Sequence, residues 1–495
     1  MRLFLSTFRL QGQLMLKRRA PKPMWRAAII ACLFGTPSAA SAACDAEKGW
    51  LPTTPVPAFG KPLPHPAPDC DFYKAAWQNF LFLAQPKVGA PAFLSYPTIA
   101  DVFGPSIASI FPAKKVGLLS LAPRALKGSN DLTETVGAFP GANSPTTINA
   151  GIRQAGLNGL LVDQNGSPIY YSMHMNDAFA KFIRINGLTS KTGVQGADPN
   201  LEFPKGAVEL KAAWQIVADG DHANYITARA SVPALKIAAN KVVIDTAVPS
   251  REVTVALLSI HVVFVLEGHP EFVWATFEHV GKDHVRDLAP DASALPSENN
   301  GLPGGIDGPI SSGGGFSLYK AGTLASEADR FQNEATMASA FDEKSQRFNK
   351  GGTTLQTSIY RLFPGSKTSD INEDDDITDL NKSIQLLFEG NAKSDLRANY
   401  RLVGAVWLDK PEVTFAANKK FANPPGTTTD DPGATVAGED GLSSMAMESF
   451  TQNSFVNCFS CHDTRAVKDF DGNVLLPPKK LNVSHILSKF VSESK

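Results

Sequence analysis

The chain has 495 residues, of which 43% are hydrophobic and 19% are charged, the composition of an ordinary globular protein. Its 47 Lys and Arg residues nearly balance its 48 Asp and Glu residues, so the formal net charge is -1. This balance excludes the strong basic footprint of a protein that binds nucleic acid or an anionic membrane surface. At about 150 residues per domain, the length predicts two or three structural units.

Residues 1–42 have the pattern of a secretory signal peptide. A positive region that includes Arg26 precedes the apolar run 27–34, and Ala40-Ser41-Ala42 supplies the small residues of a cleavage site. The apolar run is too short to span a bilayer. We therefore expect an exported, periplasmic protein without a transmembrane segment. Because the positive region is unusually long, the true start is open between Met1 and Met24.

Cysteine usage fits an oxidising compartment. Cys32 lies in the predicted signal peptide, which leaves Cys44, Cys70 and a pair near the C-terminus. In an exported protein we expect Cys44 and Cys70 to form a disulfide, which contributes about 3 kcal/mol by closing a Pro-rich loop. The alternative is two unlinked thiols.

Residues 43–155 predict an extended arm followed by a helix. The stretch 51–69 contains too many prolines for a helix or a central strand, so we expect it to lie extended on the surface. A helix follows over residues 71–83, with Asp69 or Asp71 as its N-cap.

Residues 156–416 predict a sheet-rich body. Asn165-Gly166 between two apolar runs predicts a β-hairpin over 159–171, and a short helix follows at 176–185. The run 253–265 has almost no polar alternation, which predicts a strand buried on both faces. The expected fold class is α+β, with mostly antiparallel strands. Further strands are expected at 208–217, 271–280 and 403–408, and helices at 325–340 and 376–388.

Two stretches have the composition of linkers. Residues 291–315 end in a Ser- and Gly-rich run, and residues 417–441 are rich in Asn, Pro, Gly, Thr and Asp. The second linker is expected to separate the body from a short helical C-terminal segment, residues 442–495.

The C-terminal segment contains Cys458-Phe459-Ser460-Cys461-His462, the attachment sequence of c-type haem. Its two thiols add across the haem vinyl groups, and the adjacent His462 binds the iron as the proximal ligand. A thioredoxin-like redox pair would need a βαβ context, and a structural zinc site would need a second pair of ligands. Since neither is present in the sequence, we predict one covalently bound haem c.

Six stretches of the mature chain also carry a resemblance to a known family. They are DCDFYKAAWQNFL (69–81), LVDQNGSPIYYSMHMN (161–176), DPNLEFPKGAVELKAAW (198–214), GHPEFVWATFEHV (268–280), NCFSCH (457–462) and LNVSHIL (481–487). Together they resemble a poorly characterised family of exported bacterial monohaem cytochrome c-like proteins. The resemblance implies haem binding and electron transfer, and it assigns no substrate to the large body.

The sixth iron ligand is open in the sequence. Only 33 residues follow His462, and none is methionine, so the usual downstream Met ligand is excluded. His485 is the favoured distal candidate. The alternative is that His485 belongs to a capped helix and packs against the body. Met445 or Met447 could approach from upstream, or the position could be open or filled by water. A His/His pair lowers the potential, Met/His raises it, and an open site permits peroxide or oxygen chemistry.

Five residues could in principle form a second metal site of the 2-His-1-carboxylate type: His261, His269, Glu278, His279 and His284. In an extended strand, however, Glu278 and His279 point to opposite faces. We therefore expect His261 to be a core histidine satisfied by one hydrogen bond.

Two charged residues are expected near that histidine. Glu209 and Lys211 lie two positions apart in a predicted strand, so they share one face of it. We expect either a buried pair close enough to His261 to tune it or an ordinary salt bridge.

The first functional hypothesis is a periplasmic monohaem electron-transfer protein whose body docks a redox partner. The second is a haem-dependent peroxidase or oxidase, whose pocket is built by body and tail together. The third is a haem-based ligand sensor. In all three we expect the haem to pack against the body, because about 55 residues cannot wrap a porphyrin alone. The sequence names neither a catalytic residue nor the identity of the partner protein or small-molecule substrate.

Overall fold

The computed structural model describes residues 44–493 with several gaps, so the predicted signal peptide lies outside the described residues. Parts of both predicted linkers also lie outside them. The gaps are residues 52–53, 65–66, 88–89, 104–117, 122–159, 219–223, 246, 281–287, 293–315, 325, 331, 364–372, 422–435, 440, 453–454 and 469–471.

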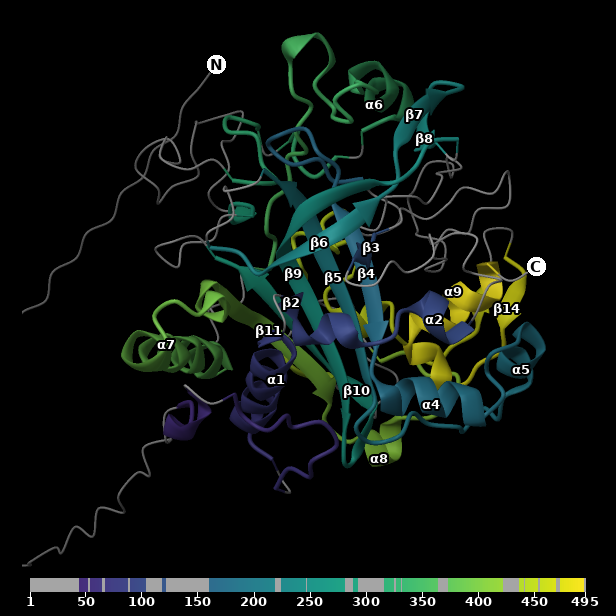
Figure 1. Cartoon of the computed structure of the whole chain (residues 1–495). Coiled ribbons are helices and arrows are strands. Elements are labelled where there is room, and N and C mark those ends of the chain that lie inside the picture. Colours follow the sequence, from purple (N-terminus) through teal and green to yellow (C-terminus); the bar gives the residue numbers. More distant parts are fainter. Residues whose placement is uncertain are drawn as a thin grey trace, which may run out of the picture. The chain divides into compact units, whose positions relative to one another are not determined.

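One eight-stranded sheet forms the centre of the molecule (Figure 1). Its strands run in the order β12-β11-β10-β9-β5-β4, and β6 pairs with β9 while β3 pairs with β6. All of these pairings are antiparallel except β3 with β6. The predicted α+β class with mostly antiparallel strands is therefore confirmed. The strands are β3 (Leu119–Ser120), β4 (Tyr170–Met175), β5 (Val208–Val217), β6 (Thr227–Val232), β9 (Arg251–Leu266), β10 (His269–His279), β11 (Tyr400–Leu408) and β12 (Val436–Gly438).

The long strand β9 is buried along most of its length, from Val255 to Leu266. It lies between β5 and β10, so both of its edges are hydrogen-bonded. Alternate side chains enter different apolar clusters: Val262 and Phe264 belong to one, and Val263 and Val265 to the other. Because alternate strand residues point to opposite faces, both faces of the sheet are covered. This confirms the burial that the unbroken apolar run predicts.

Helix α1 (Asp69–Leu83) covers the first face. Its Trp77 and Phe80 pack on Phe277 of β10, with ring centroids 5.0 and 4.3 Å apart. The N-cap prediction is wrong, because the helix begins at Asp69 and Pro68 occupies the N-cap position. Asp69 and Asp71 instead lie in the first turn, where a carboxylate interacts favourably with the helix dipole.

The opposite face is covered by the C-terminal segment together with helices α4 (Asp177–Ile185) and α9 (His485–Glu493). Helix α4 is capped by Asn176, whose side chain accepts from the Phe179 N–H. The apolar cluster on this side joins Val263 and Trp274 of the sheet to Phe459 and Ile486 of the segment.

Apart from the 19-residue helix α7, the remaining elements are short. The expected turn at Asn165-Gly166 is present, since the Asp163 N–H donates to the Ser167 carbonyl and Gly166 has φ 77°. The region 325–340 is helical only from Glu334 onward. The other elements are η1 (Lys48–Trp50), β1 (Pro86–Lys87), β2 (Ala90–Pro91), η2 (Ala92–Ser95), α2 (Ile99–Phe103), α5 (Lys191–Gly196), β7 (Leu235–Ala238), β8 (Lys241–Ile244), α6 (Glu334–Ala340), η4 (Lys350–Gly352), α7 (Glu373–Asn391), η5 (Leu396–Asn399), α8 (Pro411–Thr414), η6 (Cys458–Ser460), β13 (Val467–Lys468), β14 (Val474–Leu476) and η7 (Lys480–Val483).

Three observations bear on the organisation of the chain. Cys44 and Cys70, the pair expected from the sequence, form a disulfide. Residues 43–495 cluster as one compact unit, and β12, inside the predicted linker, pairs with β11. In the part of the chain that the structure describes, every helix is too short or too polar to serve as a membrane span.

Candidate functional site

An open cavity of about 100 Å³ lies between the sheet and the C-terminal segment. The sheet lines it with Met173 from β4, Glu209 and Lys211 from β5, His261 and Val263 from β9, and Trp274 from β10. The remaining lining comes from residues 442–462 and from His485.

The predicted haem-attachment motif forms one tight turn at the edge of this cavity. Helix η6 begins at Cys458, whose carbonyl accepts from the N–H groups of Cys461 (3.1 Å) and His462 (2.9 Å). The turn brings Cys458, Cys461 and His462 to the cavity. Phe459, between them, is fully buried in the apolar cluster. The sequence spacing thus presents two thiols and an imidazole to one space.

The His462 ring is held by contacts on one nitrogen and on both faces. Its Nδ1 donates to the Val483 carbonyl oxygen (2.8 Å), so Nε2 carries the lone pair. The ring lies between Trp274 (4.0 Å between centroids) and His485 (3.9 Å). Burial and the neighbouring His485 hold the pKa of His462 well below its usual range, so the imidazole is neutral. A neutral, oriented imidazole is the form that binds metals.

Burial and the Glu448 carboxylate raise the pKa of the Cys458 thiol above its usual range. The thiol is therefore protonated at neutral pH, and it is not a reactive thiolate of the kind found in redox enzymes.

His485 lies beside His462. The two rings stack with an interplanar angle of 23°, and His485 Nε2 contacts the Cys461 carbonyl oxygen at 3.3 Å. Two axial ligands must approach an iron from opposite sides, whereas stacked rings lie on the same side. The assignment of His485 as the distal ligand stays a prediction, and it requires the ring to move from this position. Of the two upstream methionines, Met447 lines the cavity.

The sheet presents two rows of side chains to the cavity. In one row, Lys211 of β5 lies opposite His261 of β9, which lies opposite Thr276 of β10. In the other row, two residues along the strands, Glu209 of β5 lies opposite Val263 of β9. Residues two apart on a strand share a face, which explains why both rows reach the same space.

His261 makes two side-chain contacts, one more than the sequence suggests. Its Nδ1 lies 3.0 Å from the Thr276 hydroxyl, and its Nε2 lies 3.0 Å from Glu448 Oε1. This chain of contacts extends from the sheet to a carboxylate that lines the cavity.

The two cavity carboxylates differ in their environment. Burial raises the pKa of Glu209 to about 7, although the Ser484 hydroxyl donates to it (2.6 Å). Burial also acts on Glu448, but His261, Lys211 and the Ser444 N–H together outweigh it and lower the pKa of that carboxyl. Glu448 is therefore ionised at neutral pH.

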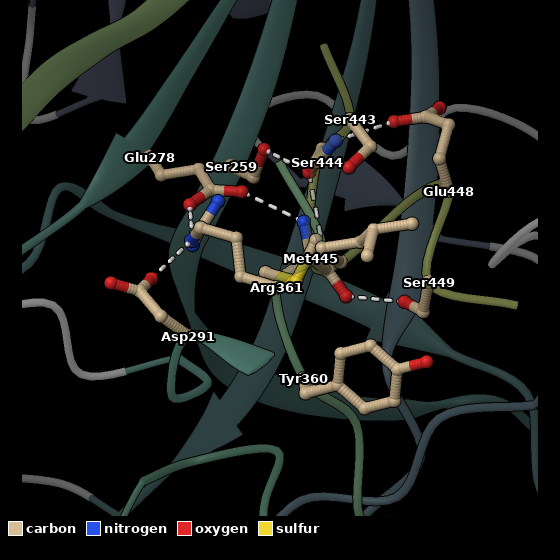
Figure 2. Close-up of polar contacts among 12 residues, drawn as sticks. Ser259, Glu278, Asp291, Tyr360, Arg361, Ser443, Ser444, Met445, Glu448 and Ser449 are labelled. Atoms are coloured by element: carbon tan, nitrogen blue, oxygen red, sulfur yellow. Dashed lines mark hydrogen bonds and ion pairs between the residues drawn. The ribbon is translucent and has the colours of Figure 1, made fainter. Parts of the chain in front are cut away.

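The segment that carries Glu448 is fastened to the sheet by buried polar contacts (Figure 2). The Glu278 carboxylate accepts from the Met445 N–H (2.8 Å) and pairs with the Arg361 guanidinium. The Ser444 hydroxyl lies 2.7 Å from that of Ser259, and its N–H donates to Glu448 (2.8 Å). These contacts fix the position of the Glu448 carboxylate.

The described residues among the five considered for a second metal site have separate partners. His269 pairs with Glu271, Glu278 with Arg361, and His279 with the Asn224 carbonyl; His284 lies outside the described residues. Among the described residues, potential ligands come together at Cys44, Cys70 and Asp376, where the two cysteines are already joined as a disulfide.

Sequence reasoning missed Val263, Trp274 and Glu448 as lining residues. Val263 and Trp274 occur inside apolar strands and carry no functional signal of their own. The position of Trp274 opposite Val263 could have been predicted, because the β9–β10 hairpin sets the pairing register of the two strands. Glu448 follows a predicted linker, and nothing in its local sequence connects it to His261.

No protein-family model, curated protein or solved structure matches this chain.

Proposed function

We propose that this chain binds one haem c covalently and acts as an exported monohaem electron-transfer protein. One observation carries the proposal: Cys458, Cys461 and His462 line a single open cavity. Cys458 and Cys461 would form the thioethers, and His462 Nε2 would bind the iron. A bound haem supplies an iron that cycles between the ferric and ferrous states.

A second observation supports the fit. Trp274 lines the cavity, and its buried indole N–H has no hydrogen-bond acceptor among the residues that the structure describes. Buried donors are normally satisfied, so this one suits a ligand that carries acceptors, such as the carboxylates of a porphyrin. The apolar side chains of Val263, Leu442 and Phe455 provide the matching non-polar lining.

The protein residues would orient the His462 ring and exclude water from it. The Val483 carbonyl holds the tautomer of His462, while Trp274 and His485 cover its two faces and keep water away. The Cys44–Cys70 disulfide supports an oxidising compartment. The partner is a redox protein or a small molecule that the chain itself does not identify.

The test is expression of the full chain with a working haem-attachment system. We expect a Soret band and a mass gain of one haem that persists after denaturation. The double variant Cys458→Ala/Cys461→Ala should lose the covalent mass gain. The matched control, Cys44→Ala/Cys70→Ala, should keep it, because that pair lies outside the cavity. A mature wild-type chain without Soret band or added mass would refute the proposal.

A second candidate function, a haem-dependent peroxidase or oxidase, is favoured by one specific observation. Lys211, His261 and Glu448 bring charged and hydrogen-bonding groups to the cavity. A site used for electron transfer alone has no need of them, and burying ionisable groups is costly.

A further inference from the structure

We infer that the cavity contains a substrate site for hydrogen peroxide, in which Glu448, oriented by His261, accepts the proton of the incoming molecule. This inference rests on the proposed haem binding and names the substrate and the residues for it. The complete reaction breaks the O–O bond of one peroxide and consumes two electrons and two protons to give two water molecules. The electrons come from an external one-electron donor of the small redox-protein class.

The first argument is the orientation of the carboxylate. Among the described residues, each Glu448 oxygen has one donor: His261 Nε2 on Oε1 and the Ser444 N–H on Oε2. Since a carboxylate offers about four acceptor positions, lone pairs remain for a ligand. The Glu448 side chain is 33% exposed, and it lines the cavity. The carboxylate is thus both fixed and accessible.

The second argument is the relay behind the carboxylate. His261 connects Glu448 to the Thr276 hydroxyl, with 3.0 Å on each side. If the hydroxyl donates to Nδ1, Nε2 carries the hydrogen and donates to Glu448. The Lys211 ammonium, from the strand next to His261, adds a positive charge on the same cavity wall. Together these donors keep Glu448 in the ionised form that can accept a proton.

The third argument is the separation of roles around the cavity. His462 and His485 stack together in the C-terminal segment, whereas Lys211 and His261 come from the sheet. Glu448 comes from the segment that Glu278 and Arg361 fasten to the sheet (Figure 2). The metal-binding group and the proton acceptor both belong to the C-terminal segment, but different contacts hold them: the Val483 carbonyl for His462, and His261 with the Ser444 N–H for Glu448. Each is therefore preorganised before a ligand enters.

The experiment uses two ligands that differ in proton chemistry. Hydrogen cyanide must lose a proton to bind ferric haem, as hydrogen peroxide must, whereas carbon monoxide binds ferrous haem without proton transfer. In the full-length holoprotein, Glu448→Gln should slow the association of cyanide and of peroxide, followed in the Soret band, by 100-fold or more. The association rate of carbon monoxide should stay within about twofold.

The matched control is His269→Gln, which removes another His–Glu contact of 3.0 Å in the same hairpin but outside the cavity. It should leave all three association rates unchanged. Equal cyanide rates in Glu448→Gln and wild type would overturn the inference, as would a holoprotein that binds none of the three ligands. A chain that takes up no haem would instead refute the proposed function, so the two failures are distinguishable.

Discussion

At the scale of single residues, the candidate cavity combines a local turn with long-range contacts. Cys458, Cys461 and His462 belong to one turn, so five consecutive residues were enough to find them. Glu448 and His261 are 187 positions apart and meet only when the segment packs on the sheet. Such a contact depends on tertiary structure, and a single sequence does not contain it in readable form.

The buried ion pair of Arg361 and Glu278 should contribute more to the free energy of unfolding than an exposed ion pair does. Both side chains are at most 2% exposed, so Arg361→Met leaves the buried Glu278 carboxylate without its ion-pair partner. The Met445 N–H and the cross-strand neighbour Arg401 compensate in part. We expect the free energy of unfolding to fall by about 3 kcal/mol. Adding Glu278→Gln should recover part of this loss, because the amide oxygen still accepts from the Met445 N–H.

Denaturant unfolding monitored by tryptophan fluorescence measures these differences. The control is Lys382→Met, which removes an exposed pair with Asp379 on α7 and should cost less than about 1 kcal/mol. If Arg361→Met lowered the free energy of unfolding no more than this control, the buried pair would not hold the segment with Glu448 on the sheet.

At the scale of elements, long strands and long helices were predicted better than short elements. The runs at 208–217 and 253–265 became β5 and β9, because apolar runs bounded by turn residues are direct signals of buried strands. The helix expected at 325–340 begins only at Glu334, where the Asn333 side chain caps it. Very short elements such as β12 have no periodicity, and their pairing with neighbours defines them.

Helix α9 illustrates how one element supports the site, since it begins at His485. Its Phe490 is 2% exposed and stacks on Phe103 of α2, with ring centroids 4.3 Å apart. Phe490→Ala should lower the free energy of unfolding by about 3 kcal/mol, through lost burial and a residual cavity. Denaturant titration checks this value. Leu386→Ala on α7, where the side chain is 67% exposed, is the control and should change stability by less than about 0.5 kcal/mol. Similar losses in both variants would contradict the packing role of α9.

At the scale of the whole molecule, the C-terminal segment is part of the body. One apolar cluster contains sheet residues such as Trp274 and segment residues such as Phe459 and Ile486. The Lys479 ammonium donates to the Val194 and Gln195 carbonyls near the end of α5, which ties the segment to a second element. The cavity therefore exists only when body and segment are together.

This dependence can be tested by cutting the chain between them. A specific protease site introduced within residues 422–435 leaves β12 and the rest of the segment as a fragment that begins near Val436. Because β12 pairs with β11 and the shared cluster stays buried, the two pieces should elute together in gel filtration without denaturant. They should separate only when denaturant exposes the cluster. An identical gel-filtration run in guanidinium chloride is the control that checks this. If the segment instead left the body under native conditions and kept a normal Soret band, a cavity wall made by the sheet would be unnecessary for the cofactor.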